Sequence, residues 1–307
     1  MKISLFGDLH IRSQSPKYRS DDYYHTQFQK LDYVLKTSHE KKSNIIILAG
    51  DVFNNYGRDP YGLVFSFIEH VMKYNQDIYA VMGQHDIKYH KLDLRETPFH
   101  ILTEVGIIKM LGPKPIKLGK DIHLYGASWD EEIPKVKKKS AVNILAVHKM
   151  IVTKKLWEGQ TDFVYAKNML KAHPSYDLIA SGDNHSSFDD KYMDRFICNS
   201  GSLCRMRSDQ KDHRPCFYIY DTKTKKLEKH YIPIEPYENV FFVDKINEEK
   251  TKREKAKDAF HKGKFSNSLR KEFSNKYSFK NLIDKKLSSK KLDSEVKTFI
   301  EKAYFDK

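Results

Sequence analysis

The sequence is short of cysteine and contains no long apolar run. Three cysteines occur in 307 residues, at positions 198, 204 and 216. They are odd in number and lack the spacing of a zinc site, which excludes a disulfide framework and predicts reduced core thiols. No apolar stretch approaches the roughly 20 residues that a membrane span requires. The first residues are also too short in their apolar part for a signal peptide. We therefore expect a cytoplasmic protein without a membrane span.

Acidic residues are too few to balance the basic ones, and the formal net charge is +14 at pH 7. Such a charge favours polyanionic partners, chiefly nucleic acid, through counterion release and electrostatic steering. A solvated Lys-rich surface is the alternative. The excess is uneven, because residues 247–307 hold 18 Lys and Arg against 10 Asp and Glu, a net of +8.

Short apolar runs recur through the first 235 residues, and most of them end in Gly, Asp, Asn or His. They lie at 3–6, 44–49, 78–82, 122–125, 143–147, 178–180, 196–198 and 216–220. Helical spacing appears between several of them, as for Tyr24, Phe28, Leu31 and Leu35. Strands that alternate with helices predict an α/β fold, in which ligands gather at the carboxyl ends of the strands.

The last part of the chain is a basic, mainly helical extension, which we place at residues 236–307. It carries two apolar stripes at helical spacing, formed by Leu269, Phe273 and Tyr277 and by Leu292, Val296, Phe299 and Ala303. Two amphipathic helices of this kind predict a helical hairpin. Its apolar faces either pack on the main domain or dock on a partner.

Residues that bind metal ions follow five of the apolar runs. They are Asp8 and His10, Asp51, the group Gln84, His85 and Asp86, His148, and Asp183 and His185. A lone Gly-Asp pair after a strand is usually a turn, so each piece is weak by itself. In an extended chain, residues two apart lie on the same side, so Asp8 and His10 can reach one metal. The repeated placement at strand ends predicts a centre for divalent cations.

This series resembles the calcineurin-like metallophosphoesterase superfamily, in the order D-x-H, GD, GNH-D, a strand-borne His and GH-x-H. The resemblance covers residues 1 to about 220. It implies a four-layer αββα sandwich over residues 1–235, with two divalent metal ions that share one Asp. Metal one would be held by Asp8, His10, Asp51 and His185, and metal two by Asp51, Gln84, His148 and Asp183. His85 would stand over the scissile phosphate, and Asp86 would orient its ring and raise its basicity. A water of lowered pKa would then attack phosphorus in line.

Two residues depart from the family pattern, and both fall on metal two. Gln84 stands where the family has Asn, and Asp183 replaces the first His of GH-x-H. An amide oxygen and a carboxylate still suit hard cations. We therefore expect Mn²⁺, with Mg²⁺ as the alternative, in place of Zn²⁺. A site with one strong metal and a weak second one is the competing interpretation.

Three further features resemble the SbcD-type nucleases of double-strand-break repair. The first motif lies in the first strand, a Gly-Ser-Leu segment occurs within residues 196–206, and the tail is basic and helical. The resemblance implies a metal-dependent DNA exonuclease or endonuclease that docks through its C-terminal helices on an SbcC-type, SMC-like ATPase. Asn54 occupies the position of a second catalytic His in those nucleases. Arg12, Ser202 and Arg205 are further candidates for substrate contacts.

Other functions remain open at this level. The superfamily also includes phosphatases and phosphodiesterases that act on small or cyclic nucleotides, and the fold does not choose among substrates. A module that binds DNA or a partner with little or no turnover is a further alternative. A homodimer is left open as well. If the chain is phage-encoded, its location would be the host cytoplasm.

The C-terminal stripe yields a prediction. Changing Leu292, Val296 and Phe299 to charged residues should abolish binding to an ATPase partner, because a docking helix depends on its apolar face. Hydrolysis of a small phosphodiester should persist, and co-purification together with this assay would measure both. Loss of folding in the triple variant would place the stripe in the core of the protein instead.

Overall fold

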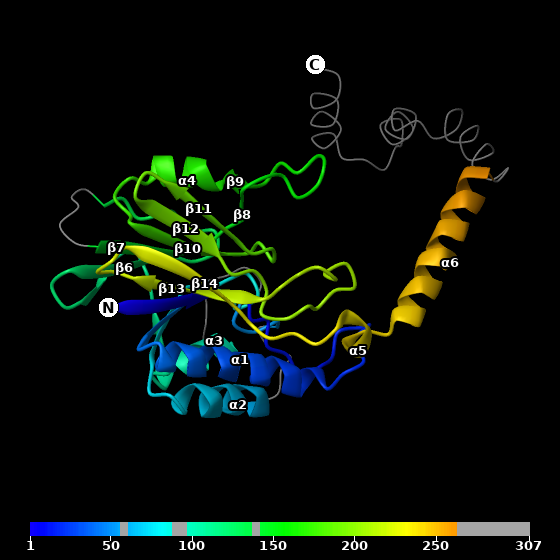
Figure 1. Ribbon diagram of the computed structural model, residues 1–307, viewed down its shortest axis with the longest axis horizontal. Coiled ribbons are helices and arrows are strands. Elements are labelled where there is room, and N and C mark those ends of the chain that lie inside the picture. The colour runs from blue at the N-terminus through cyan, green and yellow to red at the C-terminus, as the bar shows by residue number, and fades with distance from the viewer. Residues whose placement is uncertain (56–60, 88–96, 137–141, 263–307) are drawn as a thin grey trace, which may run out of the picture. The chain divides into compact units, whose positions relative to one another are not determined.

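The computed structural model of the chain describes residues 1–55, 61–87, 97–136 and 142–262 (Figure 1). Two compact units are distinguished, Met1–Phe242 and Val243–Lys307. Within the described residues, no helix combines the length and the apolar character needed to cross a membrane.

The first unit is built around two six-stranded sheets. The first sheet has the order β14-β13-β1-β2-β3-β4. Its strands are β1 (Lys2–Phe6), β2 (Ile45–Leu48), β3 (Asp77–Ala80), β4 (Ile108–Met110), β13 (Cys216–Asp221) and β14 (Lys226–Tyr231). Strands β1 to β4 run parallel, and β13 pairs antiparallel with β1 and with β14. All four residues of β2 are buried, as is typical of a strand that is covered on both faces.

The second sheet has the order β11-β12-β10-β7-β6-β5. Its strands are β5 (Ile116–Leu118), β6 (Ile122–Ala127), β7 (Val142–His148), β10 (Leu178–Gly182), β11 (Phe188–Tyr192) and β12 (Arg195–Asn199). The central strands β6, β7, β10 and β12 are parallel, with antiparallel partners at the two edges. A small parallel pair, β8 (Ile151–Val152) and β9 (Val164–Tyr165), follows β7.

Helices cover the outer face of each sheet (Figure 1). Helices α1 (Tyr23–Glu40), α2 (Tyr61–Met72) and α3 (Pro98–Glu104) share a buried cluster with the first sheet, and α4 (Ala166–Ala172) shares one with the second. Asp22 caps the start of α1, and its side chain accepts a hydrogen bond from the amide of His25 at 3.0 Å. The stripe predicted for α1 is buried at Phe28, Leu31 and Leu35. Tyr24 is exposed, and Tyr23 takes the buried position in its place.

The two sheets pack face to face through a third apolar cluster. Ile3 and Leu5 of β1 are part of it, together with Ile144 and Ala146 of β7. Because side chains alternate along a strand, Ser4 lies on the other face of β1. There its hydroxyl donates to Ser38 of α1 at 2.8 Å. The order of layers is therefore helix, sheet, sheet, helix, which confirms the predicted four-layer sandwich.

The first compact unit continues past the predicted boundary at residue 235. Helix α5 (Tyr237–Val240) follows β14, and Val240 and Phe241 are buried. The amide of Phe242 donates to the carbonyl of Tyr18 at 2.9 Å. Helix α6 (Val243–Lys262) belongs to the second unit and includes an i,i+4 ion pair between Arg253 and Glu249. The two apolar stripes predicted at 269–303 lie outside the described residues.

Two phenylalanines of α2 provide a test of the packing. Phe67 is fully buried and contacts Phe53, whereas Phe65 is 64% exposed. We expect Phe67→Ala to lower the free energy of unfolding by about 3–5 kcal/mol, because it opens a cavity in the core. Phe65→Ala should change it by less than about 0.5 kcal/mol. Urea denaturation followed by circular dichroism would measure both changes, and equal losses would contradict this description of α2.

Candidate metal centre

Loops that follow strands of both sheets converge at one site. Asp8 and His10 follow β1, Asp51 follows β2, and the segment 84–86 follows β3. From the second sheet, His148 ends β7, and Asp183 and His185 follow β10. Main-chain hydrogen bonds join the first two loops, since the amides of Asp8 and His10 donate to the carbonyls of Gly50 and Asp51. The structure thus brings together all seven side chains that were predicted as metal ligands.

The backbone at the site is left-handed at several residues other than glycine. The φ angles are 49° at Asp8, 46° at His10, 51° at Asp51 and 79° at Asp183. This region is sparsely populated, and such residues cluster at functional sites because their surroundings must hold them in place. The chain from Asp8 to His10 is therefore not extended, which corrects the geometry expected from the sequence. The side chains of Asp8 and His10 come together because the backbone turns at these two residues.

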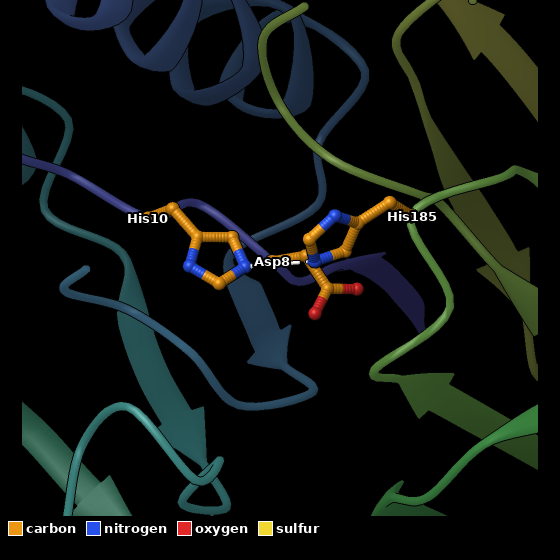
Figure 2. Close-up of side chains that lie close together, drawn as sticks. All are labelled: Asp8, His10 and His185. Carbon is orange, nitrogen blue, oxygen red and sulfur yellow. Dashed lines mark hydrogen bonds between the residues drawn. The ribbon is translucent and has the colours of Figure 1, made fainter. Parts of the chain in front are cut away.

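Ligand atoms from three sets of residues lie within 4.8 Å of one another in each set: Asp8, His10 and His185; His10, Asp51 and His85; Asp8, Asp51 and His148. Figure 2 shows the first set, with the rings of His10 and His185 close together. Their Nε2 atoms are 3.0 Å apart. Asp51 is central, because its Oδ2 lies 3.5 Å from the Nε2 of His10 and 3.5 Å from the Nε2 of His148.

Unsatisfied polar atoms show that cations fit this cluster. Oδ2 of Asp8 and Oδ2 of Asp51 are buried without a hydrogen-bond partner among the described residues, and both side chains are fully buried. A buried carboxylate oxygen without a donor is costly unless a cation or a protonated group neutralises it. The imidazole and carboxylate atoms are ligands that divalent metals accept.

The electrostatics of the cluster point the same way. Burial, with a smaller contribution from Asp51, raises the pKa of Asp8 well above its usual value. Burial also lowers the pKa of His10 to about 3 and lowers the pKa of His185, so both rings are neutral, the form that ligates metal. At Asp51 burial opposes ionisation, but the facing histidines, His148 first, outweigh it and lower the pKa of this carboxyl.

The hydrogen bonds of Gln84 explain how its longer side chain fits. Nδ1 of His148 faces the carbonyl oxygen of Ala49 at 2.7 Å and so carries the ring proton. In a neutral ring, Nε2 then presents a lone pair to Oε1 of Gln84 at 2.7 Å, which brings two acceptors together. Turning the Gln84 amide around would place its nitrogen beside His148 and its oxygen beside Asp183. Two acceptors would then meet at Oδ1 of Asp183, which lies 3.2 Å from the present position of the amide nitrogen. A cation held by His148, Gln84 and Asp183 would remove the conflict, and a second proton on the His148 ring would also do so.

His85 stands at the edge of the cluster, half-buried. Its amide donates to Oδ1 of Asp51 at 2.9 Å, and its Nδ1 donates to the carbonyl of Asn54 at 2.8 Å. The ring also makes an edge contact with His10, with 4.9 Å between the ring centroids. The proton on Nδ1 leaves Nε2 as the atom that can meet a substrate.

Asp86 does not orient His85, which corrects the expectation from the sequence. Its carboxylate instead accepts the amides of Val52 at 3.0 Å, Phe53 at 3.2 Å and Gly83 at 2.9 Å. These bonds hold the loops after β2 and β3 together. Burial and the neighbouring Asp51 raise the pKa of Asp86 to about 7. The carbonyl of Asn54, in place of Asp86, orients the ring of His85.

The predicted substrate contacts are placed differently. Ser202 is fully buried, and its hydroxyl donates to the carbonyl of Cys204 at 2.9 Å. Arg205 is 4% exposed and donates to the carbonyl of Glu235. Arg12 is half-buried, and its amide donates to Gln27. Ser202 therefore shapes the loop instead of reaching a substrate, and neither arginine belongs to the metal cluster.

A cavity of about 470 Å³ opens beside His185. Its lining includes two acidic residues, Asp209 and Asp212, together with His213, Arg214 and Tyr231. The guanidinium of Arg214 lies over the ring of Tyr231, 4.5 Å from its centroid. The sequence reasoning missed His213, Arg214 and Tyr231. The only signal was the charged run after the Gly-Ser-Leu segment, which is too common on protein surfaces to identify a site.

Two facing sheets, with a cluster of His and Asp at the ends of their strands, define a metal-dependent phosphoesterase. A family model for calcineurin-like phosphoesterases matches residues 1–203, and the chain belongs to that family. Members of the family bind two divalent metal ions, and the clusters described above are able to hold them.

Several solved structures are similar in fold. The protein TT1561 of Thermus thermophilus is 13% identical, with a TM-score of 0.49, over 76% of this chain and 99% of that one. A Staphylococcus aureus protein assigned as a 5′-nucleotidase is 13% identical, with a TM-score of 0.47, over 76% and 54%. A dimetal phosphatase from Danio rerio is 8% identical, with a TM-score of 0.44, over 76% and 97%. Among functionally curated proteins, no sequence matches the chain.

Two glycines provide a matched test of the centre. A Cβ at Gly83 would lie 2.0 Å from Oδ1 of Asp51, whereas a Cβ at Gly62, in α2, would meet nothing within 4 Å. We expect Gly83→Ala to displace Asp51 and to weaken metal binding and hydrolysis by about 10- to 100-fold. Gly62→Ala should leave both unchanged. Metal content and hydrolysis of bis-p-nitrophenyl phosphate would be measured on variants whose circular dichroism is intact, and equal behaviour of the two would contradict the role of Asp51.

Proposed function

We propose that this phosphoesterase is a DNA nuclease, an exonuclease or endonuclease that uses two divalent cations. The observation that carries the proposal is the combination of this centre with a net charge of +14. A basic protein attracts the phosphodiester backbone of nucleic acid, and the charge favours a long polyanion over a small nucleotide because more phosphates are contacted at once.

The residues around the centre divide the chemistry among them. When bound, the two cations would lower the pKa of the attacking water and neutralise charge that builds on the phosphate oxygens. His85, held by the carbonyl of Asn54, presents Nε2. When the ring carries a second proton on Nε2, this atom can donate a hydrogen bond to a phosphate oxygen or pass that proton to the leaving oxygen. Asp51 accepts the amide of His85 and so fixes the distance between this ring and the cluster.

The cavity beside His185 supports a nucleotide unit as the substrate. Arg214 stacked on the half-exposed Tyr231 forms a flat surface of the kind on which nucleobases stack, in a lining that also holds Asp209 and Asp212. A strand whose phosphate sits at the centre could place a neighbouring base there. The cavity is open at the surface and would admit a polymer.

For the metal, we propose Mn²⁺, with Mg²⁺ as the alternative. Three carboxylates, Asp8, Asp51 and Asp183, and the amide oxygen of Gln84 give the cluster several oxygen ligands. Hard cations prefer oxygen, whereas Zn²⁺ favours nitrogen and sulfur. Activity that appears with Zn²⁺ alone would contradict this assignment.

For partners, we propose DNA and an SbcC-type ATPase, which would dock on the basic C-terminal extension. The charge excess of residues 247–307 supports DNA, and the sequence stripes at 269–303 support a docking helix. Light scattering of the purified chain, alone and with the ATPase, would separate such a complex from a homodimer.

A second candidate function is a phosphatase or phosphodiesterase for small or cyclic nucleotides. The cavity volume of about 470 Å³ favours it, since pockets for small ligands have volumes of about 300–1,000 Å³. A third candidate, a binding module with little turnover, would require a centre that holds one metal at most.

The deciding experiment compares substrates on one preparation. With Mn²⁺ present, we expect cleavage of linear DNA and of bis-p-nitrophenyl phosphate and little action on cyclic nucleotides. His85→Ala should lower kcat by about 10²-fold or more while it retains metal, because the ring acts on the substrate. Asp51→Ala should lose both metal and activity.

The outcomes separate the three candidates. Intact DNA together with cleaved cyclic nucleotide would replace the nuclease with the second candidate. No rate above background in the unmodified protein, with one metal bound per chain at most by calorimetry, would favour the binding module.

A further inference from the structure

A second cavity, of about 220 Å³, lies apart from the metal cluster, between α1 and the segment that follows β14. Three of its charged lining residues are basic, Arg19, Lys30 and Arg205, and one is acidic, the exposed Glu235. Tyr33 and the apolar residues Ile232 and Val240 complete the walls. Arg19 and Arg205 are only 5% and 4% exposed.

Within the described residues, only one of the three cations has a carboxylate partner. Arg19 donates from Nε to Asp21 at 2.7 Å, and Thr26 also donates to that carboxylate, at 2.6 Å. Lys30 has a carbonyl at 3.4 Å as its acceptor, that of Pro233, and Arg205 donates to the carbonyl of Glu235. Neither Lys30 nor Arg205 forms an ion pair in this part of the chain. The cavity therefore carries excess positive charge.

This excess opposes the folded state unless an anion offsets it. Burial lowers the pKa of Lys30, and the nearby Arg205 and Arg19 lower it further. Burial lowers the pKa of Arg205 as well, and Arg19 adds to the shift. Partly buried cations that repel one another gain free energy when an anion binds between them.

The size of the cavity limits the ligand. A volume of about 220 Å³ is below the roughly 300–1,000 Å³ of pockets that enclose drug-sized molecules. A single tetrahedral anion is small enough to fit. A phosphate group carries about −1.5 to −2 charges and three acceptor oxygens, so it can accept from Lys30 and Arg205 together.

The cavity is also joined to the metal cluster through one short loop. The amide of Leu203 donates to the carbonyl of Asp8 at 3.2 Å, and Arg205 follows two residues later. The carbonyl of Arg205 accepts from Arg19 at 2.9 Å. An anion held by Arg205 would therefore be bound by the same loop, residues 203–205, that donates a hydrogen bond to Asp8 of the metal centre.

We propose that this cavity is a phosphate-binding site distinct from the metal centre. Its ligand is either free inorganic phosphate or a backbone phosphate of nucleic acid, which share the same recognising chemistry. Binding of inorganic phosphate does not depend on the proposed nuclease function, whereas the backbone source rests on it.

The test uses the full-length protein stripped of metal with a chelator, so that the metal centre cannot bind phosphate through cations. Calorimetry with inorganic phosphate at constant ionic strength should detect binding, and Lys30→Gln should weaken it about tenfold or more. Lys30→Arg should retain it. Lys36→Gln is the matched control, since Lys36 lies on the same helix with its side chain 65% exposed.

Gln29→Glu provides a second variant that removes no buried contact. Gln29 is exposed and lines the cavity, so the new carboxylate would neutralise the excess charge and abolish phosphate binding. Fluorescence anisotropy with a short single-stranded oligonucleotide identifies the source. Weaker oligonucleotide binding in both variants indicates a backbone phosphate, and an effect on inorganic phosphate alone indicates the free ion.

Unchanged affinity for inorganic phosphate in Lys30→Gln and Gln29→Glu, or no binding by the unmodified protein, would overturn the proposal. Failure of the nuclease function would be seen separately, as intact DNA in the hydrolysis assay. Circular dichroism of each variant would confirm that it is folded.

Discussion

The buried carboxylate of Asp51 is the group around which the rest of the site is arranged. Its Oδ1 accepts the amide of His85, and its Oδ2 lies midway between two imidazoles from opposite sheets. This position requires glycine on either side. Gly50 has a φ of +92°, and Gly83 approaches so closely that any side chain would collide with Asp51. The neighbouring Asp86 holds the same two loops by accepting three amides. A carboxylate in so dense a setting is stable as an anion only with positive charge beside it.

Much of the fold and of the site could be predicted because the relevant signals are local. The central strands are short apolar runs, and those that carry ligands end in the ligand residues themselves. The edge strands were harder to find. Strand β14 reads Lys226-Leu-Glu-Lys-His-Tyr231 and is half-exposed, so its residues do not distinguish a strand from a loop. The choice between Tyr23 and Tyr24 as the buried residue of α1 depends on where the helix begins, which periodicity alone leaves uncertain.

The roles of individual side chains were harder to predict from the sequence, because they depend on atoms that the tertiary structure brings together. Asp86 is adjacent to His85 in sequence, yet its carboxylate turns away to three amides of two loops. Ser202 is polar and follows a glycine, as expected of a phosphate contact, but its hydroxyl is used within its own loop. The left-handed backbone at Asp8 and His10 could not be read from residue type, since Asp and His adopt that conformation only where the surroundings impose it. Gln84 is the opposite case: its unusual identity is visible in the sequence, and the structure places its amide between His148 and Asp183.

The ligands come from both sheets, and this has a consequence for the stability of the folded protein. Asp8, His10 and Asp51 follow strands of one sheet, whereas His148 ends a strand of the other and Asp183 and His185 follow another of its strands. Ions held by both groups would join the two sheets. Such a bridge adds to the free energy of unfolding in proportion to the logarithm of the free ion concentration above its dissociation constant. The resistance of this protein to heat and to proteolysis would therefore follow the supply of divalent ions in its surroundings, independently of any substrate.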